Sequence, residues 1–112
     1  KYRARGPAVV DTGFDGGVYP NMEIIRMFRG SKPISTVEFE SPLYHGRAEF
    51  EVYTGEVSFY HHGGYVKLGD EKIYIPKEPE LIYSEVLIGR EILNQLKEVL
   101  LKPETRTLAL TF

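Results

Sequence analysis

The segment from Ala8 to Gly17 constrains the fold of this chain more than any other stretch. Three apolar residues, Ala8-Val9-Val10, lead directly into Asp11-Thr12-Gly13. Because small and β-branched residues favour strands, this run predicts a buried strand that ends at the aspartate. Glycines at positions 13, 16 and 17 allow the chain to turn sharply after it. The sequence therefore predicts an aspartate presented on a tight loop at the end of a strand.

The rest of the chain is typical of one small domain that is mainly β. It has 112 residues, and its eleven glycines, seven prolines and eight tyrosines favour a turn-rich β protein. No linker or internal repeat divides it, so a single domain over residues 1–112 is predicted. Alternating apolar and polar residues predict a long hairpin with its tip at Pro42 to Arg47. Further strands are expected at 2–5, which ends at a break at Gly6-Pro7, and at 56–60. A second, tighter hairpin is expected from strands 65–68 and 72–75 around Gly69. A closing hairpin is expected from strands 99–101 and 107–112.

Two short helices interrupt the strands. Asn21 is a good N-cap for a helix of about two turns that ends at Gly30. A second helix is predicted from Arg90 to Lys97, and its buried face is formed by Ile92, Leu93 and Leu96.

Composition excludes several kinds of protein. The net charge of −2 gives no general attraction to nucleic acid or to an anionic membrane, and the absence of cysteine excludes disulfides and thiolate metal sites. No apolar run approaches the roughly 20 residues of a membrane span, and a cytoplasmic location is expected. The chain begins at Lys1 and not at a methionine, so removal of an upstream segment, with any targeting signal, stays open.

Two motifs in order resemble the retropepsin-like aspartic proteases, particularly their small cellular and archaeal branch. The first is Val9-Val10-Asp11-Thr12-Gly13, and the second is Val86-Leu87-Ile88-Gly89-Arg90-Glu91-Ile92-Leu93, which is similar to the Gly-Arg segment that opens the family's helix. The order of strands, hairpin and helix from Pro7 onwards also matches. The resemblance implies a retropepsin-like β-barrel with two short helices, and a subunit that forms half of a two-fold symmetric dimer.

Peptide hydrolysis by carboxylates requires two of them sharing one proton, and this chain has a single Asp-Thr-Gly. The resemblance therefore implies a homodimer in which Asp11 of each subunit activates one water, without a metal ion or a cofactor. Thr12 would lock the pair through hydrogen bonds between subunits, and Gly13 would let an extended peptide substrate approach closely.

The resemblance also implies roles for residues around the aspartate. Asp15 and Arg90 would form a bidentate ion pair, at least partly buried, that braces the loop. The long hairpin would be the flap that closes over substrate, with Tyr44 and Gly46 at its tip. The later hairpin, with glycines at 63, 64 and 69, is the alternative flap.

Two features depart from the family. Phe14 stands where small residues are usual, so it is expected to narrow a substrate pocket. Only ten residues precede Asp11, so the dimer interface is expected to depend on the strand from Thr107 to Phe112.

Other readings of the sequence stay open. A protease-fold module that dimerises or binds peptides with little turnover is the main alternative, and a small nucleic-acid-binding β-barrel is a weaker one. His61-His62 is interpreted as a solvated turn and not as a metal site, because adjacent strand residues point to opposite faces. The basic cluster of Arg26, Arg29 and Lys32 is interpreted as solubilising.

Overall fold

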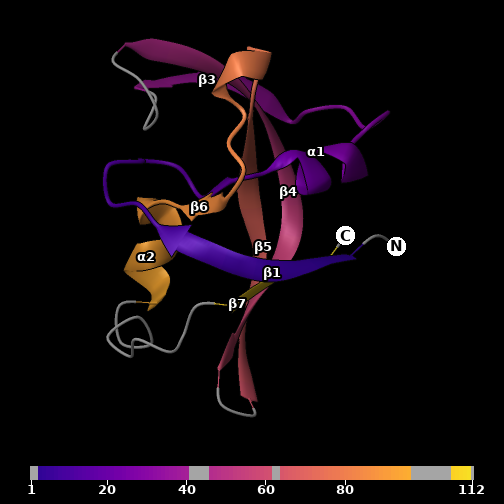
Figure 1. The fold of residues 1–112 in the computed structure, drawn as a ribbon, viewed down its shortest axis with the longest axis vertical. Coiled ribbons are helices and arrows are strands. Elements are labelled where there is room, and N and C mark those ends of the chain that lie inside the picture. Colours follow the sequence, from indigo (N-terminus) through magenta and orange to yellow (C-terminus); the bar gives the residue numbers. More distant parts are fainter. Residues whose placement is uncertain (1–2, 41–45, 62–63, 97–106, 112) are drawn as a thin grey trace.

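The protein is mainly β, with two short helices, as expected. The computed structural model describes residues 3–40, 46–61, 64–96 and 107–111. Figure 1 shows the two helices, α1 (Met22–Met27) and α2 (Arg90–Leu96), on different sides of the long strands. The strands are β1 (Arg3–Val10), β2 (Val18–Tyr19), β3 (Ser35–Glu40), β4 (Arg47–His61), β5 (Gly64–Pro76), β6 (Val86–Ile88) and β7 (Thr107–Thr111). The helices are α1 (Met22–Met27), α2 (Arg90–Leu96) and a 3-10 turn at Pro79–Leu81.

The described strands form one mixed sheet in the order β3-β4-β5-β2-β6-β1-β7. β1 is parallel to β6 and β2 is parallel to β5, whereas the other pairings are antiparallel. Because β7 also pairs with β4, six strands follow one another in a closed ring of pairings, and β3 lies outside it. This arrangement places the end of β1 next to the end of β6.

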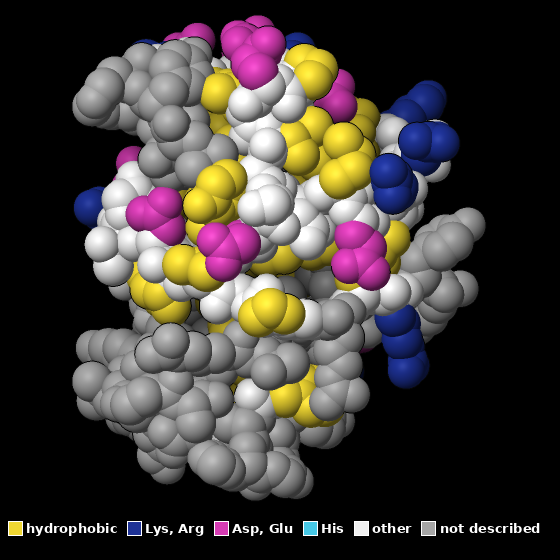
Figure 2. Space-filling model, in the orientation of Figure 1, with side chains coloured by type: hydrophobic (Ala, Val, Ile, Leu, Met, Phe, Trp, Pro, Cys, Tyr) yellow, Lys and Arg dark blue, Asp and Glu magenta, His cyan; other side chains and the backbone are white. Residues whose placement is uncertain are grey.

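The core has two hydrophobic clusters. The larger one lies among β1, β2, β4, β5, β6 and the two helices, and includes the fully buried side chains of Val18, Val57, Phe59, Ile73 and Ile92. The second is largely aromatic and includes Phe14, Tyr19, Phe50 and Tyr74. The surface over this framework is mixed: on the face in Figure 2, hydrophobic and acidic side chains are interspersed, and Lys and Arg gather at the edge near α1.

Several predicted elements are confirmed. The long hairpin is formed by β3 and β4, which pair from Ser35 with Val52 to Glu40 with Arg47. Asn21 caps α1 by accepting a hydrogen bond from the Ile24 N–H at 3.2 Å. Helix α2 begins at Arg90 with Ile92 fully buried, while the side chain of Leu96 lies outside the described residues.

The first strand differs from the prediction in two ways. β1 continues through Gly6-Pro7 and does not break there, because its partner changes at that point from β7 to β6 and no break is needed. The strand is also not buried along its length. Ala8 is buried, but Val9 and Val10 are 40% and 46% exposed.

The second, tighter hairpin predicted around Gly69 is wrong. β4 runs through Gly55 without a break, and β5 runs through Gly69 as one strand, so the two form one long hairpin that closes from His61 to Gly64. Gly69 has a φ of 84° and lies where the register shifts between Val57 and Ser58. A β-bulge, which glycine accommodates, therefore produced the turn-like signal. The tip of the alternative flap, at 62–63, lies outside the described residues.

The C-terminal strand is present as β7, but it is not free to pair with a partner subunit. It pairs with β1 along one edge and with β4 along the other. Both edges are thus paired within the chain, so a dimer interface at this strand could not be formed by adding a partner's strand to either edge. The interface itself stays a prediction. The predicted strand at 99–101 and its turn lie outside the described residues. No helix in the described ranges is long and apolar enough to cross a membrane.

Candidate active site

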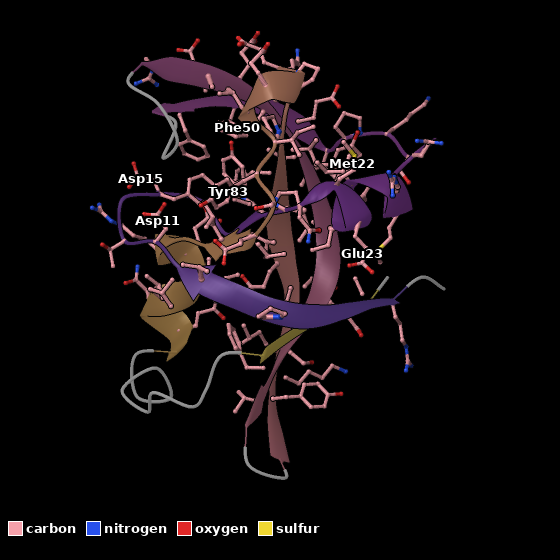
Figure 3. The ribbon with its side chains drawn as sticks, viewed as in Figure 1. Asp11, Asp15, Met22, Glu23, Phe50 and Tyr83 are labelled. Carbon is pink, nitrogen blue, oxygen red and sulfur yellow. The ribbon has the colours of Figure 1, made fainter. Side chains whose placement is uncertain are left out.

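The Asp-Thr-Gly loop begins where β1 meets β6. The Asp11 N–H donates to the carbonyl of Ile88 at 2.9 Å, which extends the parallel ladder by one bond. The loop then turns tightly: Oδ1 of Asp11 accepts the Gly13 N–H at 2.9 Å, and its carbonyl accepts the Phe14 N–H at 3.2 Å. These bonds fix the carboxylate relative to the strand while leaving the Asp11 side chain half-exposed. Figure 3 shows Asp11 and Asp15 together on this side of the molecule.

The second motif packs directly against this loop. Three backbone N–H groups at the start of α2 donate to loop carbonyls: Gly89 to Gly17 at 2.7 Å, Arg90 to Phe14 at 2.9 Å, and Glu91 to Gly16 at 3.1 Å. The structure therefore brings together the two segments that carry the family resemblance, although they are distant in the sequence.

Arg90 also contacts the loop through its side chain. Its Nε donates to the Thr12 carbonyl at 2.7 Å, and its Nη1 lies 3.2 Å from Oδ1 of Asp15. The predicted ion pair is thus confirmed, but it is not bidentate, because the guanidinium divides its donors between two residues. It is not buried either: the Arg90 and Asp15 side chains are 60% and 61% exposed. An exposed pair of this kind contributes little to stability.

Phe14 does not line a substrate pocket, contrary to its expected role. Its side chain is fully buried, and its ring makes edge-to-face contacts with Tyr19, Phe39 and Tyr74 at centroid distances of 5.4, 5.7 and 5.7 Å. The loop turns back after Gly13, so the next side chain points into the aromatic cluster. A large residue at this position therefore fills the core beneath the aspartate.

A hydrogen bond that the sequence did not predict supports the same loop. The hydroxyl of Tyr74, on β5, lies 2.9 and 2.8 Å from the two carboxylate oxygens of Glu91. Burial, and then the Glu91 carboxylate, raise the pKa of Tyr74 well above its ordinary value. No local signal in the sequence pairs the two residues, which lie 17 positions apart on a strand and a helix.

The other predicted site residues have different positions. Thr12 and Gly13 are exposed, and among the described residues nothing pairs with the Thr12 hydroxyl. Gly46 is exposed with a φ of 125°, a conformation that favours glycine. Tyr44 lies outside the described residues. Within the described ranges, no group of three or more His, Asp or Glu side chains is placed to hold a metal ion.

Comparisons with known proteins add no relative. No family model matches the chain, and searches of curated proteins and of solved structures find no match. The site is therefore defined by its own geometry: one half-exposed carboxylate on a loop fixed by backbone hydrogen bonds. One such carboxylate can act as an acid, a base or a hydrogen-bond acceptor, whereas sharing a proton requires a second carboxylate in direct contact with it.

Proposed function

We propose that this chain is an aspartic endopeptidase with a retropepsin-like fold, active as a homodimer. Asp11 of each subunit would lie beside the two-fold axis, and the pair would hold one proton between them. The ionised carboxylate removes a proton from a water as it attacks the scissile carbonyl, while the protonated one donates to the carbonyl oxygen. Collapse of the tetrahedral intermediate then breaks the C–N bond: the carboxyl that took the water's proton gives it to the leaving nitrogen, and the other carboxylate takes a proton from a hydroxyl of the intermediate, which restores the singly protonated pair.

The observation that carries this proposal is the packing of Asp11-Thr12-Gly13 against Gly89-Arg90. Such a loop holds a carboxylate in one orientation through hydrogen bonds from Gly13 and to Ile88. Pre-positioned groups are what acid–base catalysis requires. The burial of Phe14 supports the enzyme further, because a fully buried ring does not project into a substrate cleft beside the aspartate.

The second subunit is required because the sequence has one Asp-Thr-Gly. Val9 and Val10, directly before Asp11, are exposed β-branched side chains that a partner would cover. The exposed Thr12 hydroxyl is available for a bond between subunits. We therefore place the proposed contact around this loop and not at the edges of β7, which are already paired.

Replacement of Asp11 by Asn tests the mechanism. Cleavage of a fluorogenic peptide library should be lost in Asp11→Asn, while the fold and dimer persist by circular dichroism and sedimentation equilibrium. Asp70→Asn, which removes an exposed carboxylate elsewhere, should keep full activity.

Activity of the wild-type chain should rise and then fall with pH, because only the singly protonated pair of Asp11 carboxyls is active. An active Asp11→Asn protein would rule out this mechanism.

A peptide-binding module without turnover is the second candidate. The occupied edges of β7 favour it, because they remove one surface through which a partner would bring a second carboxylate. A statine-type inhibitor separates the two candidates. It should raise the melting temperature of a dimeric enzyme, since a ligand that binds only the folded state stabilises it. A monomer that binds peptides without cleaving them would support the module.

A further inference from the structure

A groove lies beside α1, away from the candidate active site. Its volume is about 270 Å³, and residues of α1, the turn after it, β4 and β5 line it. In Figure 3, Met22 at the start of α1 lies on the opposite side of the view from Asp11 and Asp15. The groove is therefore a separate surface that the proposed peptidase site does not use.

The floor of the groove is apolar and fixed. The rings of Phe28 and Tyr53 are buried and pack with their centroids 4.9 Å apart, and the Tyr53 hydroxyl donates to Glu51 at 3.1 Å. Ile25 and Ile75 are half-buried around these rings, and Met22 is 40% exposed. Small-molecule pockets usually measure about 300–1,000 Å³. A groove slightly below this range suits an apolar side chain of a docked peptide.

The rim of the groove is basic. Arg26 and Arg29 line it, and Lys32 follows in the adjoining loop. None of the three forms an ion pair with another described residue, although the whole chain carries a net charge of −2. Figure 2 shows Lys and Arg side chains beside hydrophobic ones at this edge. Glu51 is the acidic lining residue, and the Tyr53 hydroxyl already bonds to it.

We propose that this groove docks a protein segment in which an apolar side chain is flanked by Asp or Glu. The apolar side chain would occupy the space over Phe28 and Tyr53, and the flanking carboxylates would pair with Arg26 and Arg29. Complementary charge selects such partners and accelerates their association. A purely solubilising cluster would need no apolar cavity between its cations. Docking in this groove requires no peptidase activity at Asp11.

Selection from a library of displayed random short peptides tests the proposal without assuming a sequence. Peptides enriched on the wild-type chain should combine Asp or Glu with Leu, Ile, Phe or Met. Their affinity, measured by fluorescence anisotropy, should fall about tenfold in the Arg26→Gln/Arg29→Gln double variant and should weaken with added salt. Arg3→Gln/Lys72→Gln removes the same charge outside the groove lining and should bind like wild type.

Met22→Glu provides an independent variant. An acidic residue is favourable in the first turn of a helix, so α1 should persist while the groove loses an apolar side chain and gains a negative charge. Weaker binding with unchanged circular dichroism supports the proposal. Enriched peptides without acidic residues, or equal binding to the double variant, would overturn it. The chain could instead cosediment with phosphatidylserine vesicles in a way that requires Arg26 and Arg29, while no acidic peptides are enriched. That result would assign the surface to a lipid and would also overturn the proposal.

Discussion

The hydroxyl of Tyr74 bonds to both carboxylate oxygens of Glu91, at 2.9 and 2.8 Å, and so joins the C-terminal end of β5 to the first turn of α2. Glu91 also donates its backbone N–H to Gly16, in the loop that follows Asp11. One residue therefore connects a core strand to the loop that presents the candidate catalytic carboxylate. The rigidity of that loop should therefore depend on Tyr74 and Glu91, although neither side chain takes part in the reaction proposed at Asp11.

Replacing Tyr74 with Phe should lower the free energy of unfolding by about 1–3 kcal/mol, because the Glu91 carboxylate loses its donor while the ring stays in place. Urea unfolding measures this change. Tyr83→Phe is the matched control, since Tyr83 is exposed and should change stability very little. In a double-mutant cycle with Glu91→Gln, the two effects should not add. Additive losses would mean that the two side chains do not stabilise each other.

Stability should decline at alkaline pH because of the same pair. Burial, followed by Glu91, raises the pKa of Tyr74, so the folded chain holds this proton more tightly than the unfolded chain, whose tyrosines titrate near 10.0. The contribution of protonated Tyr74 to the free energy of unfolding is therefore complete below pH 10.0, and it is lost as the pH rises towards the pKa of Tyr74 in the folded chain. The free energy of unfolding should fall there by up to about 1.4 kcal/mol per pH unit.

Tyr74→Phe should make this decline shallower. Some slope should remain, because burial and Glu51 raise the pKa of Tyr53 as well. Urea titrations at matched alkaline pH values compare the two proteins. Identical slopes would show that Tyr74 is not the group whose ionisation opposes folding.

Local signals predicted the parts of this fold that depend on local chemistry. The cap at Asn21, the start of α2 at Arg90 and the alternation of β3 and β4 each follow from neighbouring residues. The resemblance of the two motifs anticipated the contact between Arg90 and Asp15. The family, the activity and the dimer remain predictions.

Features that depend on distant residues were missed. Gly69 resembles a turn in sequence because a glycine at a bulge and a glycine at a hairpin tip give the same local signal. The inward direction of Phe14 depends on how its loop packs on β5 and α2. The hydrogen bond from Tyr74 to Glu91 joins two residues whose separation in the sequence matches neither the helix period nor the strand period. Burial and pairing of this kind arise from the closed arrangement of the strands.

Gly89→Ala should prevent stable folding or cost about 3 kcal/mol or more. A Cβ there would meet the Phe14 ring at 2.6 Å and the Phe14 carbonyl oxygen at 2.7 Å, and it would also clash with the Gly16 carbonyl. Gly6→Ala is the control, because a Cβ at Gly6 meets nothing within 4 Å. Thermal melts followed by circular dichroism compare the two variants. A stable Gly89→Ala protein would contradict the close packing of the two motifs.

Phe14→Ala should lower the free energy of unfolding by about 3–5 kcal/mol, because it leaves a cavity among aromatic rings. Phe14→Leu should cost less, since it keeps part of the buried volume. Urea unfolding gives both values. A change below about 1 kcal/mol in Phe14→Ala would instead fit a ring that lines a substrate pocket, as the sequence predicted.

Arg90 should matter more than Asp15, although the two form an ion pair. Asp15→Asn removes one exposed carboxylate and should cost less than about 1 kcal/mol. Arg90→Met also removes the Nε–H that the Thr12 carbonyl accepts at 2.7 Å, so the loop beside Asp11 loses its side-chain clamp. We expect a larger loss of stability and, if the chain is a peptidase, a lower kcat with Arg90→Met than with Asp15→Asn.

Arg90→Lys should not restore the stability of the wild-type chain, because an ammonium does not present the two donors of the guanidinium fork. Equal effects of Asp15→Asn and Arg90→Met in urea unfolding and peptide cleavage would show that the ion pair, and not the bond to Thr12, is the important contact.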